Sequence, residues 1–296
     1  MLYGEGFFTL PRSISYEVSK MIAILADIHG NLHALEAILA DMPEVKEIWS
    51  LGDMLSGPPF PCEILDTLMN MNVPVHSVLG NNDERVLAGR NKGFSKQFSA
   101  DNWVSQTLKP HHWSFLKSLP LCLSVDSISG GALLFHGTPS DVVGMIRNED
   151  EAAAVAAGCK EKFLVGGHRH RSSLYMLNTQ SLIVSGSVGL SIDGIGGMAA
   201  YTLIDDSAPE PTIGFRRIPY DVEKAINALK SSSLAEIAPG LSRAYILEMT
   251  KGKFYTMGLV TFANQLAEKH LGHKPDRIPD EIWEQAEREW DGSEWR

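Results

Sequence analysis

The chain has 296 residues, of which 44% are hydrophobic and 21% charged, and its formal net charge is -10. This composition is typical of a globular protein with a substantial core, in one large domain or two modest ones. The negative charge argues against nonspecific binding of nucleic acid or of an anionic membrane, because both would be repelled. A small anionic substrate would need local positive charge, for which bound metal ions are the expected source.

The sequence predicts neither a membrane span nor a disulfide framework. No apolar run is long enough to cross a bilayer, and residues 1–20 lack the basic start and continuous apolar core of a signal peptide. We expect 1–20 to form an N-terminal arm. Cys62, Cys122 and Cys159 are widely separated and form no CxxC motif, which is typical of a reducing compartment and argues against a thiolate zinc site. The predicted location is cytoplasmic.

The first part of the chain alternates short apolar runs with amphipathic ones. Apolar residues 22–26 precede a helical pattern over 31–42, and the same order repeats along 45–53, 62–70, 73–83 and the segment after Glu84. Strands that alternate with helices predict βαβ units and a mostly parallel sheet covered by helices. Sheets of this kind bind ligands beyond the carboxyl ends of their strands.

The later part of the chain changes character twice. Short β-like runs with glycine-rich connections predict a second, more antiparallel sheet; they are GALLFHG, KFLVGGHRH, SLIVSGSVG, AAYTLID and TIGFRRI. From Tyr220 the pattern is helical, with prolines as breaks. We therefore predict an α/β fold of two stacked mixed β-sheets flanked by helices over 21–220. A helical C-terminal extension over 221–296 should pack on that domain, with a homodimer contact or a lid as the alternatives.

Seven polar side chains lie at or near the ends of predicted strands. Taken singly, each has an ordinary structural role, because an aspartate can cap a helix, an asparagine can form a turn and a histidine can pack in a core. Taken together, carboxylates and imidazoles without thiolates suit two adjacent divalent ions such as Mn2+, Fe2+ or Zn2+, with one carboxylate shared between them. The seven residues are Asp27, His29, Asp53, Asn81, His136, His168 and His170.

The segments that carry these residues resemble, in content and order, the scattered signature of the calcineurin-like metallophosphoesterases; they are DIHGN, LGDM, LGNND, FHGTPSD and GGHRH. The chain is similar to the compact bacterial and archaeal phosphodiesterase branch of that family, since GDMLSGPPFPCEIL and SGSVG match segments of the branch. The resemblance covers residues 21–220 and implies a four-layer αββα sandwich. It says nothing about the C-terminal extension.

The resemblance also implies how the seven residues divide between two ions. One metal would be held by Asp27, His29, Asp53 and His170. The other would be held by Asp53, Asn81, His136 and His168, so that Asp53 is the bridge. Water between the ions would provide hydroxide at neutral pH for direct in-line attack on a phosphoryl group, and no Ser or Cys nucleophile is required.

The chain departs from the family pattern at Asn82. Most members have a histidine there, in G-N-H-D/E, whereas this chain reads Gly80-Asn81-Asn82-Asp83. A histidine can protonate a leaving oxygen, but a neutral amide can only donate a hydrogen bond. We therefore expect poor leaving groups to react slowly, and Asp83 to match the acid that closes the motif and orients the residue before it. A second departure, Val184-Ser185 in place of Asn-Pro, involves no ligand.

Further residues are predicted to contact substrate or to support the site. Arg169, between two candidate ligands, and Arg85, just past the third motif, are candidates to hold a phosphate oxygen, with a solvent-exposed position as the alternative for each. Asn31 should cap the first helix, whose N-terminus points toward the site. His111 and His112 lie in a helical insertion before His136 and are weaker candidates for a replacement acid.

These features predict a metal-dependent phosphoric ester hydrolase that cleaves phosphodiester or phosphoanhydride bonds, such as a phosphodiesterase or a dinucleoside polyphosphate hydrolase. Its partner would be a small phosphate ester or nucleotide. A phosphoprotein or phosphomonoester phosphatase is the alternative within the enzyme class, and a non-catalytic scaffold on the same fold is the alternative outside it. A scaffold normally has eroded ligand positions, and all seven are intact here.

Overall fold

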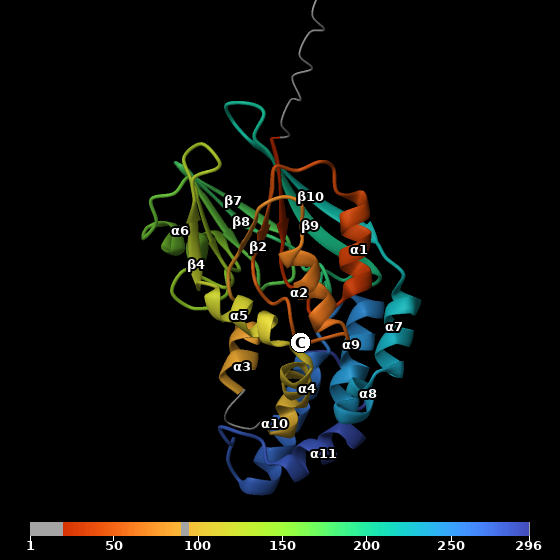
Figure 1. Ribbon diagram of the computed structural model, residues 1–296. Coiled ribbons are helices and arrows are strands. Elements are labelled where there is room, and N and C mark those ends of the chain that lie inside the picture. Colours follow the sequence, from red (N-terminus) through yellow and green to blue (C-terminus); the bar gives the residue numbers. More distant parts are fainter. Residues whose placement is uncertain (1–19, 90–94, 296) are drawn as a thin grey trace, which may run out of the picture.

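Two five-stranded mixed sheets, stacked face to face, form the centre of the molecule (Figure 1). The computed structural model describes residues 20–89 and 95–295, so the predicted arm lies outside the described residues apart from Lys20. The first sheet has the strand order β10-β9-β1-β2-β3, with β1 Met21–Leu25, β2 Glu47–Ser50, β3 Val75–Ser77, β9 Met198–Asp205 and β10 Thr212–Pro219. The second has the order β4-β5-β6-β8-β7, with β4 Cys122–Val125, β5 Ala132–Phe135, β6 Phe163–Gly166, β7 Ser173–Leu177 and β8 Gln180–Val184.

The central strand β1 shows why the chain forms packed layers. Successive side chains of a strand point to opposite faces of its sheet. Ile22 and Ile24 lie in the apolar cluster between the two sheets, whereas Ala23 and Leu25 lie in the cluster between the first sheet and its outer helices. All four are fully buried. A strand covered on both faces must be apolar at every position, and this is why residues 22–26 show no alternation.

Strand pairing differs from the sequence-based prediction in two ways. The runs of β9 and β10, predicted for the second sheet, extend the first one, because β9 pairs antiparallel with β1 and β10 pairs with β9. The second sheet is also less antiparallel than predicted, since β5, β6 and β8 run parallel. Its edge strands β4 and β7 were not predicted. Their residues are mostly exposed or half-buried, so they carry little apolar signal.

Helices cover the outer faces of both sheets and complete the four predicted layers. The first sheet is covered by α1 Leu32–Asp41, α2 Pro61–Met69 and α5 Pro110–Ser118, and the second by α6 Glu149–Ala156. After β3 the chain continues through α3 Asn81–Gly89, the short 3-10 helix η1 Lys96–Phe98 and α4 Ser99–Thr107. No helix within residues 20–89 and 95–295 is both long enough and apolar enough to cross a membrane.

The C-terminal extension forms a helical unit below the sandwich in Figure 1, with α7 Val222–Ser231, α8 Ser233–Ile237, α9 Pro239–Lys251, α10 Thr256–Leu271 and α11 Asp280–Glu289. These helices share an apolar cluster in which Leu259 and Trp283 are fully buried. Ala100 of α4 and Leu190, which follows β8, belong to the same cluster. The extension therefore packs against elements that continue from the ends of the parallel strands.

Replacing Leu259 by Ala should destabilise the protein, because it removes buried apolar surface and leaves a cavity in this cluster. Changes of this kind typically cost about 2–5 kcal/mol. The matched control is Leu271→Ala in the same helix, where the side chain is 42% exposed and the expected change is within about 0.5 kcal/mol. Urea unfolding followed by circular dichroism measures both. Equal midpoints for the two variants would show that the cluster does not stabilise the extension.

Candidate metal centre

The parallel strands deliver the candidate ligands to one edge of the sandwich. Asp27 follows β1, Asp53 follows β2, and Asn81 begins α3 just after β3. In the second sheet, His136 directly follows β5, and the segment with His168 and His170 follows β6. Because both sheets end on this side, all seven candidate residues are brought together, as the sequence predicted from strand ends alone.

The backbone at these positions has an uncommon conformation. Six non-glycine residues in the described part of the chain have positive φ, and five of them are candidate ligands: Asp27, His29, Asp53, His168 and His170, with φ between 50 and 64°. L-residues avoid this left-handed region, at a cost of roughly 1–3 kcal/mol each. The sixth is Ser56, whose carbonyl accepts from His29, so all six strained positions lie at the candidate ligands or in direct contact with one.

Glycines allow the ends of β2 and β3 to approach closely. Gly80 has no side chain where a Cβ would meet the backbone nitrogen and the Oδ1 atom of Asp53. Gly52 has φ of +83° and lies against the backbone of Gly80. The small size of both residues is therefore what places Asp53 beside Asn81 and Asn82.

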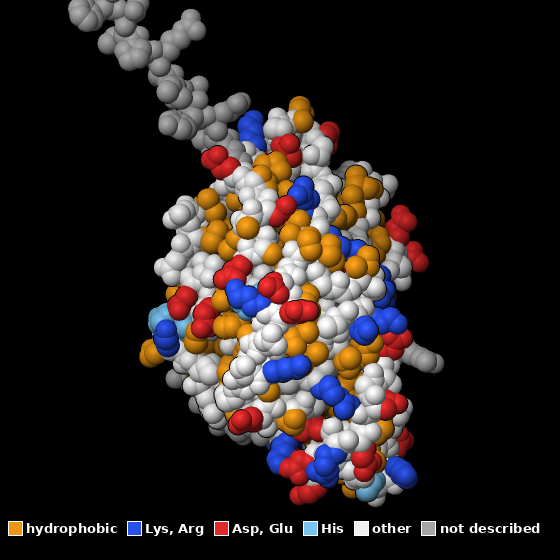
Figure 2. Space-filling view, turned by 90° about the vertical axis from the view of Figure 1, so that its right-hand side faces the viewer, with side chains coloured by type: hydrophobic (Ala, Val, Ile, Leu, Met, Phe, Trp, Pro, Cys, Tyr) orange, Lys and Arg blue, Asp and Glu red, His pale blue; other side chains and the backbone are white. Residues whose placement is uncertain are grey.

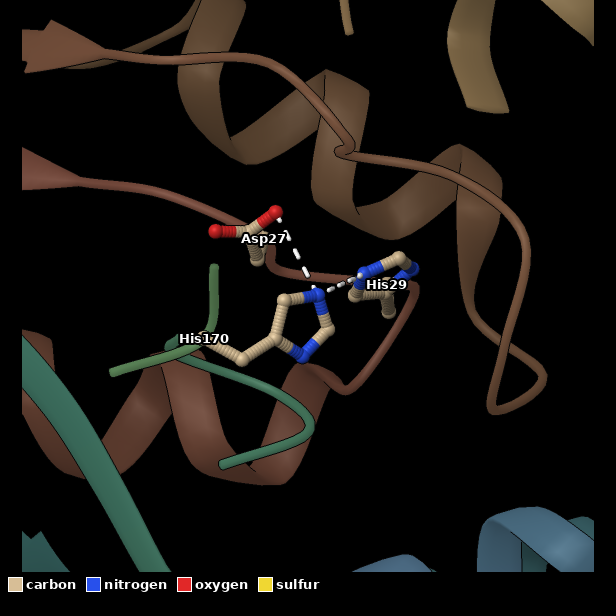
Figure 3. A group of neighbouring side chains, drawn as sticks. All are labelled: Asp27, His29 and His170. Carbon is tan, nitrogen blue, oxygen red and sulfur yellow. Dashed lines mark hydrogen bonds and ion pairs between the residues drawn. The ribbon is translucent and has the colours of Figure 1, made fainter. Parts of the chain in front are cut away.

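The first group of candidate ligands comprises Asp27, His29 and His170, shown in Figure 3. The Nε2 atoms of His29 and His170 face each other at 3.2 Å, and His170 Nε2 lies 3.4 Å from Asp27 Oδ1. The Nδ1 atoms of both rings contact backbone carbonyls, of Ser56 at 2.8 Å and of Leu190 at 2.6 Å. Since a carbonyl oxygen only accepts, Nδ1 carries the proton and Nε2 presents its lone pair to the centre.

The second group comprises Asp53, His136 and His168. His136 Nδ1 donates to the carbonyl of Leu51 (2.7 Å), so its Nε2 atom also faces inward. That atom lies 3.0 Å from Asn81 Oδ1 and 3.4 Å from Asp53 Oδ2. Asp53 Oδ2 is also 3.8 Å from His29 Nε2, which belongs to the first group. Asp53 therefore lies between the two groups, at the position predicted for a bridging carboxylate.

Electrostatics in the centre favour a bound cation. Burial alone would lower the pKa of His136, but the charge and hydrogen bond of Asp53, together with Asp27 and the Leu51 carbonyl, raise that pKa to about 10. Burial would raise the pKa of Asp53, but the charge and hydrogen bond of His136, the charge of His29 and the backbone nitrogen of Asn82 together lower that pKa. Asp27 Oδ1 is buried and has no hydrogen-bond partner within the described residues. A divalent ion that displaces the protons of the facing imidazoles would be bound by their Nε2 atoms and by this oxygen, so the donor set fits a metal without thiolates.

Comparison with known proteins identifies the family. The model of the calcineurin-like phosphoesterase superfamily domain matches residues 21–206. The chain belongs to this superfamily. Membership identifies the general activity as phosphoester hydrolysis and the Asp and His groups as a site for divalent metal.

Three relatives illustrate the extent of the similarity. An uncharacterized protein of Methanocaldococcus jannaschii is 29% identical over 241 residues, which is 74% of this chain and 96% of that protein. The crystal structure of a metallophosphoesterase from Sphaerobacter thermophilus superposes with a TM-score of 0.66 at 26% identity, covering 79% of this chain and 99% of that one. A symmetrical bis(5'-nucleosyl)-tetraphosphatase of Erwinia tasmaniensis is 35% identical over 77 residues, 23% of this chain and 28% of that protein.

Asn82, where the chain departs from the family motif, donates two hydrogen bonds to Asp53. The backbone nitrogen of Asn82 donates to Asp53 Oδ1 (2.8 Å) and its side-chain amide donates to Asp53 Oδ2. The amide oxygen accepts from Arg85, whose guanidinium also pairs with Asp101. Ser56 in turn donates to Asp101. The roles of Asp101 and Ser56 were not predicted, because neither residue lies in a recognisable motif.

Asp83 has a different role from the one predicted. It is fully buried, and its carboxylate accepts from the backbone nitrogens of Leu55 (3.1 Å) and Gly80 (3.2 Å). Burial and, after it, the charge of Asp53 raise the pKa of Asp83 to about 7. Asp83 thus connects the loop after β2 to the loop after β3. Its carboxylate is bound to backbone nitrogens and not to the side chain of residue 82.

Two residues predicted to contact substrate, Asn31 and Arg169, have partners inside the protein instead. Asn31 caps α1 by accepting from Ala34 (3.2 Å) and donates to the carbonyl of Gly189 (2.8 Å), and it is 1% exposed. The capping role is confirmed, but its side chain is satisfied inside the protein. Arg169 donates to Ser173 (3.0 Å) and Tyr175 (3.1 Å) on β7. Neither Asn31 nor Arg169 is among the described residues that line the cavity over the centre.

The paired histidines of the helical insertion also lie elsewhere. Both His111 and His112 contact Asp66, at 3.1 and 2.8 Å, and neither lines the cavity in the described structure. Their hydrogen bonds join α5 to α2. The structure therefore provides no support for either as a replacement acid.

A cavity of about 470 Å³ opens over the candidate ligands. Its floor includes His29, Asp53, Asn81, His168 and His170, and Arg85 is the cation among the described residues that line it. Part of its wall comes from the C-terminal extension, including Phe254 and Trp295. This wall was not predicted, because the apolar residues at helical spacing over 254–271 usually indicate core packing and Trp295 lies outside any helical pattern.

Replacing Asp53 by Asn should lower metal content as well as activity, because the shared carboxylate loses its charge. Removal of residues that merely support metal ligands typically costs about 10–100-fold in affinity, so a loss of at least about tenfold is expected here. Metal content after dialysis, measured by mass spectrometry, tests this, with the exposed Asp126→Asn as the matched control. If circular dichroism shows that the variant is folded and its metal content equals that of the control, Asp53 is not a metal ligand.

Proposed function

We propose that the protein is a hydrolase of phosphodiester or phosphoanhydride bonds that depends on two divalent metal ions. The observation that carries the proposal is the position of Asp53, within 4 Å of imidazoles from both ligand groups on the floor of one cavity. Two-metal hydrolases of phosphate esters share a carboxylate in this way. The similarity of a 77-residue stretch to a dinucleoside tetraphosphatase supports the inclusion of phosphoanhydrides.

In this proposal the first ion is held by Asp27, His29, Asp53 and His170, and the second by Asp53, Asn81, His136 and His168. Mn2+, Fe2+ and Zn2+ all suit this donor set. When bound, such ions lower the pKa of water and offset charge on the phosphoryl oxygens. The carbonyls of Ser56, Leu51 and Leu190 keep the rings oriented with Nε2 inward, so the site is organised before metal or substrate arrives.

Asn82 supports a preference for substrates whose leaving group needs no proton. A neutral amide is too weak an acid to transfer a proton, and here its nitrogen is bound to Asp53 and its oxygen to Arg85. Alkyl phosphomonoesters, including phosphoserine, leave as strongly basic alkoxides and need general acid help. For this reason we rank the phosphomonoesterase alternative second. The intact ligand groups argue against the non-catalytic scaffold.

Three free cysteines support the proposed cytoplasmic location. Cys62, Cys122 and Cys159 form no disulfide among the described residues, as expected in a reducing compartment.

On the face shown in Figure 2, acidic and basic side chains are interspersed. A mixed surface of this kind suits small substrates better than a polyanion that needs a broad basic patch.

The substrate preference is tested with purified protein supplied with Mn2+. We expect bis-p-nitrophenyl phosphate or diadenosine tetraphosphate to have a higher kcat/KM than phosphoserine peptides or glycerol phosphate, because p-nitrophenolate and nucleotide leaving groups are weak bases. The Asp53→Asn protein serves as the control for contaminating activity. A clear preference for the alkyl monoesters would contradict the proposal.

Replacing Asn82 by His should selectively increase kcat/KM for substrates that have poor leaving groups. General acid catalysis is typically worth about 10² to 10⁴ in rate, and an imidazole has a pKa near 6.5. Asp83 is occupied by backbone amides and does not face residue 82, so a gain near the lower end, about 10², is expected for glycerol phosphate. The gain for bis-p-nitrophenyl phosphate should be small.

The control for this substitution is Asn82→Ala, which removes the contact with Asp53 without adding a proton donor. Both variants are compared by kcat/KM on the alkyl and the aryl substrate. Equal changes on the two substrates in Asn82→His would show that residue 82 does not govern leaving-group protonation.

A further inference from the structure

The cavity has two chemically different sides. The floor carries the candidate metal ligands, and much of the remaining wall is apolar, contributed by Phe98, Tyr245, Phe254, Met257, Val260 and Trp295. Five of these six residues come from the C-terminal extension, beyond the 21–206 segment that matches the family model. The wall is therefore a feature of this chain that the general phosphoesterase chemistry does not require.

The aromatic side chains of the wall begin next to the metal centre and extend to the surface. The ring of Phe254 stacks on candidate ligand His170, with centroids 6.2 Å apart and an interplanar angle of 30°. Trp295 meets Phe254 edge to face at 5.8 Å, and its backbone nitrogen donates to the Phe254 carbonyl (2.9 Å). Trp295 is 49% exposed although it lines the cavity. It therefore stands at the mouth with part of its ring still open to a ligand.

The charged side chains of the cavity do not suit a polyphosphate. Beside the candidate ligand Asp53, the lining includes Asp101 and Glu248, which are 3% and 2% exposed. Arg85 is the lining cation among the described residues, and its guanidinium is already paired with Asp101 and Asn82. Within residues 20–89 and 95–295, phosphates beyond the one at the metal centre would lie against these buried carboxylates with no unpaired lining cation, which is unfavourable.

We propose that the aromatic wall binds a planar aromatic group of the substrate, so that the protein prefers phosphodiesters with a single negative charge and at least one aromatic substituent. This inference rests on the proposed function and narrows it, since it disfavours dinucleoside polyphosphates. A volume of about 470 Å³ is within the range of small-ligand sites. Stacking of a flat group on Phe254 and Trp295 supplies affinity on the side of the cavity away from the metal ligands.

The kinetic test uses two esters that share p-nitrophenolate as leaving group, bis-p-nitrophenyl phosphate and methyl p-nitrophenyl phosphate, with the Mn2+-loaded protein. The difference in KM then reports the second substituent alone. We expect KM to be lower for the diaryl ester by at least about fivefold, given the usual strength of aromatic stacking. Trp295→Leu should remove most of that difference while kcat changes by less than about twofold, and Trp295→Phe should retain it.

A binding measurement provides a readout that does not depend on catalysis. Diphenyl phosphate is titrated into the metal-free and the Mn2+-loaded protein by isothermal titration calorimetry. We expect its Kd to rise by about fivefold or more in Trp295→Leu and to stay near the wild-type value in Trp295→Phe. Phe215→Leu, an exposed aromatic on β10 that does not line the cavity, is the control and should change neither KM nor Kd.

The outcomes separate this inference from the proposed function. If neither ester is hydrolysed with any divalent metal, the proposed function fails, and the diphenyl phosphate titration still decides whether the wall binds aryl groups. If both esters are hydrolysed with equal KM and Trp295→Leu binds diphenyl phosphate like the wild type, the inference is overturned and the function stands. A higher kcat/KM for diadenosine tetraphosphate than for bis-p-nitrophenyl phosphate would overturn the single-charge preference.

Discussion

Asp53 is a carboxylate with 1% exposure that must be neutralised inside the protein. A buried charge without partners costs several kcal/mol, and here the partners come from separate parts of the chain. His29 and His136 face it from the first and second sheets, and Asn82 donates to it twice. The left-handed backbone at the strand ends persists because only this conformation turns the side chains toward the shared centre. The two sheets hold their ends firmly enough to sustain that strain.

The replacement of the usual motif histidine by Asn82 has a structural consequence besides the chemical one. Through Arg85, Asn82 connects Asp53 to Asp101 on α4. α4 also contributes Ala100 to the apolar cluster of the C-terminal helices. The same helix therefore contacts the metal centre on one side and the extension on the other. A continuous set of hydrogen bonds and packed side chains thus links residues more than a hundred positions apart in sequence.

The extension shows how a common site can acquire its own selectivity. The family domain supplies the strand ends and the candidate ligands, whereas Phe254 and Trp295 lie after it in the chain. Chemistry and substrate choice are then separate tasks performed by separate segments, which is a common way for one fold to serve many substrates. In this chain the second segment adds apolar surface and the buried Glu248 to the cavity, and none of its described lining residues is a lysine or arginine.

The sequence by itself determined the α/β class, the sandwich and the seven residues of the centre. It could do so because strand periodicity is local, and because the carboxyl ends of parallel strands meet at one edge whatever the details of packing. Tertiary structure alone decided that β9 and β10 join the first sheet and that Asp83 binds the backbone of two loops. It also decided that Arg169 turns to β7 and that Trp295 reaches the cavity. The pairing of β9 with β1 and the contacts of Asp83 with Leu55 and of Trp295 with Phe254 join residues far apart in the chain, and no local pattern encodes such contacts. The partners of Arg169 are close in sequence, but they come within its reach because the chain turns into β7 there.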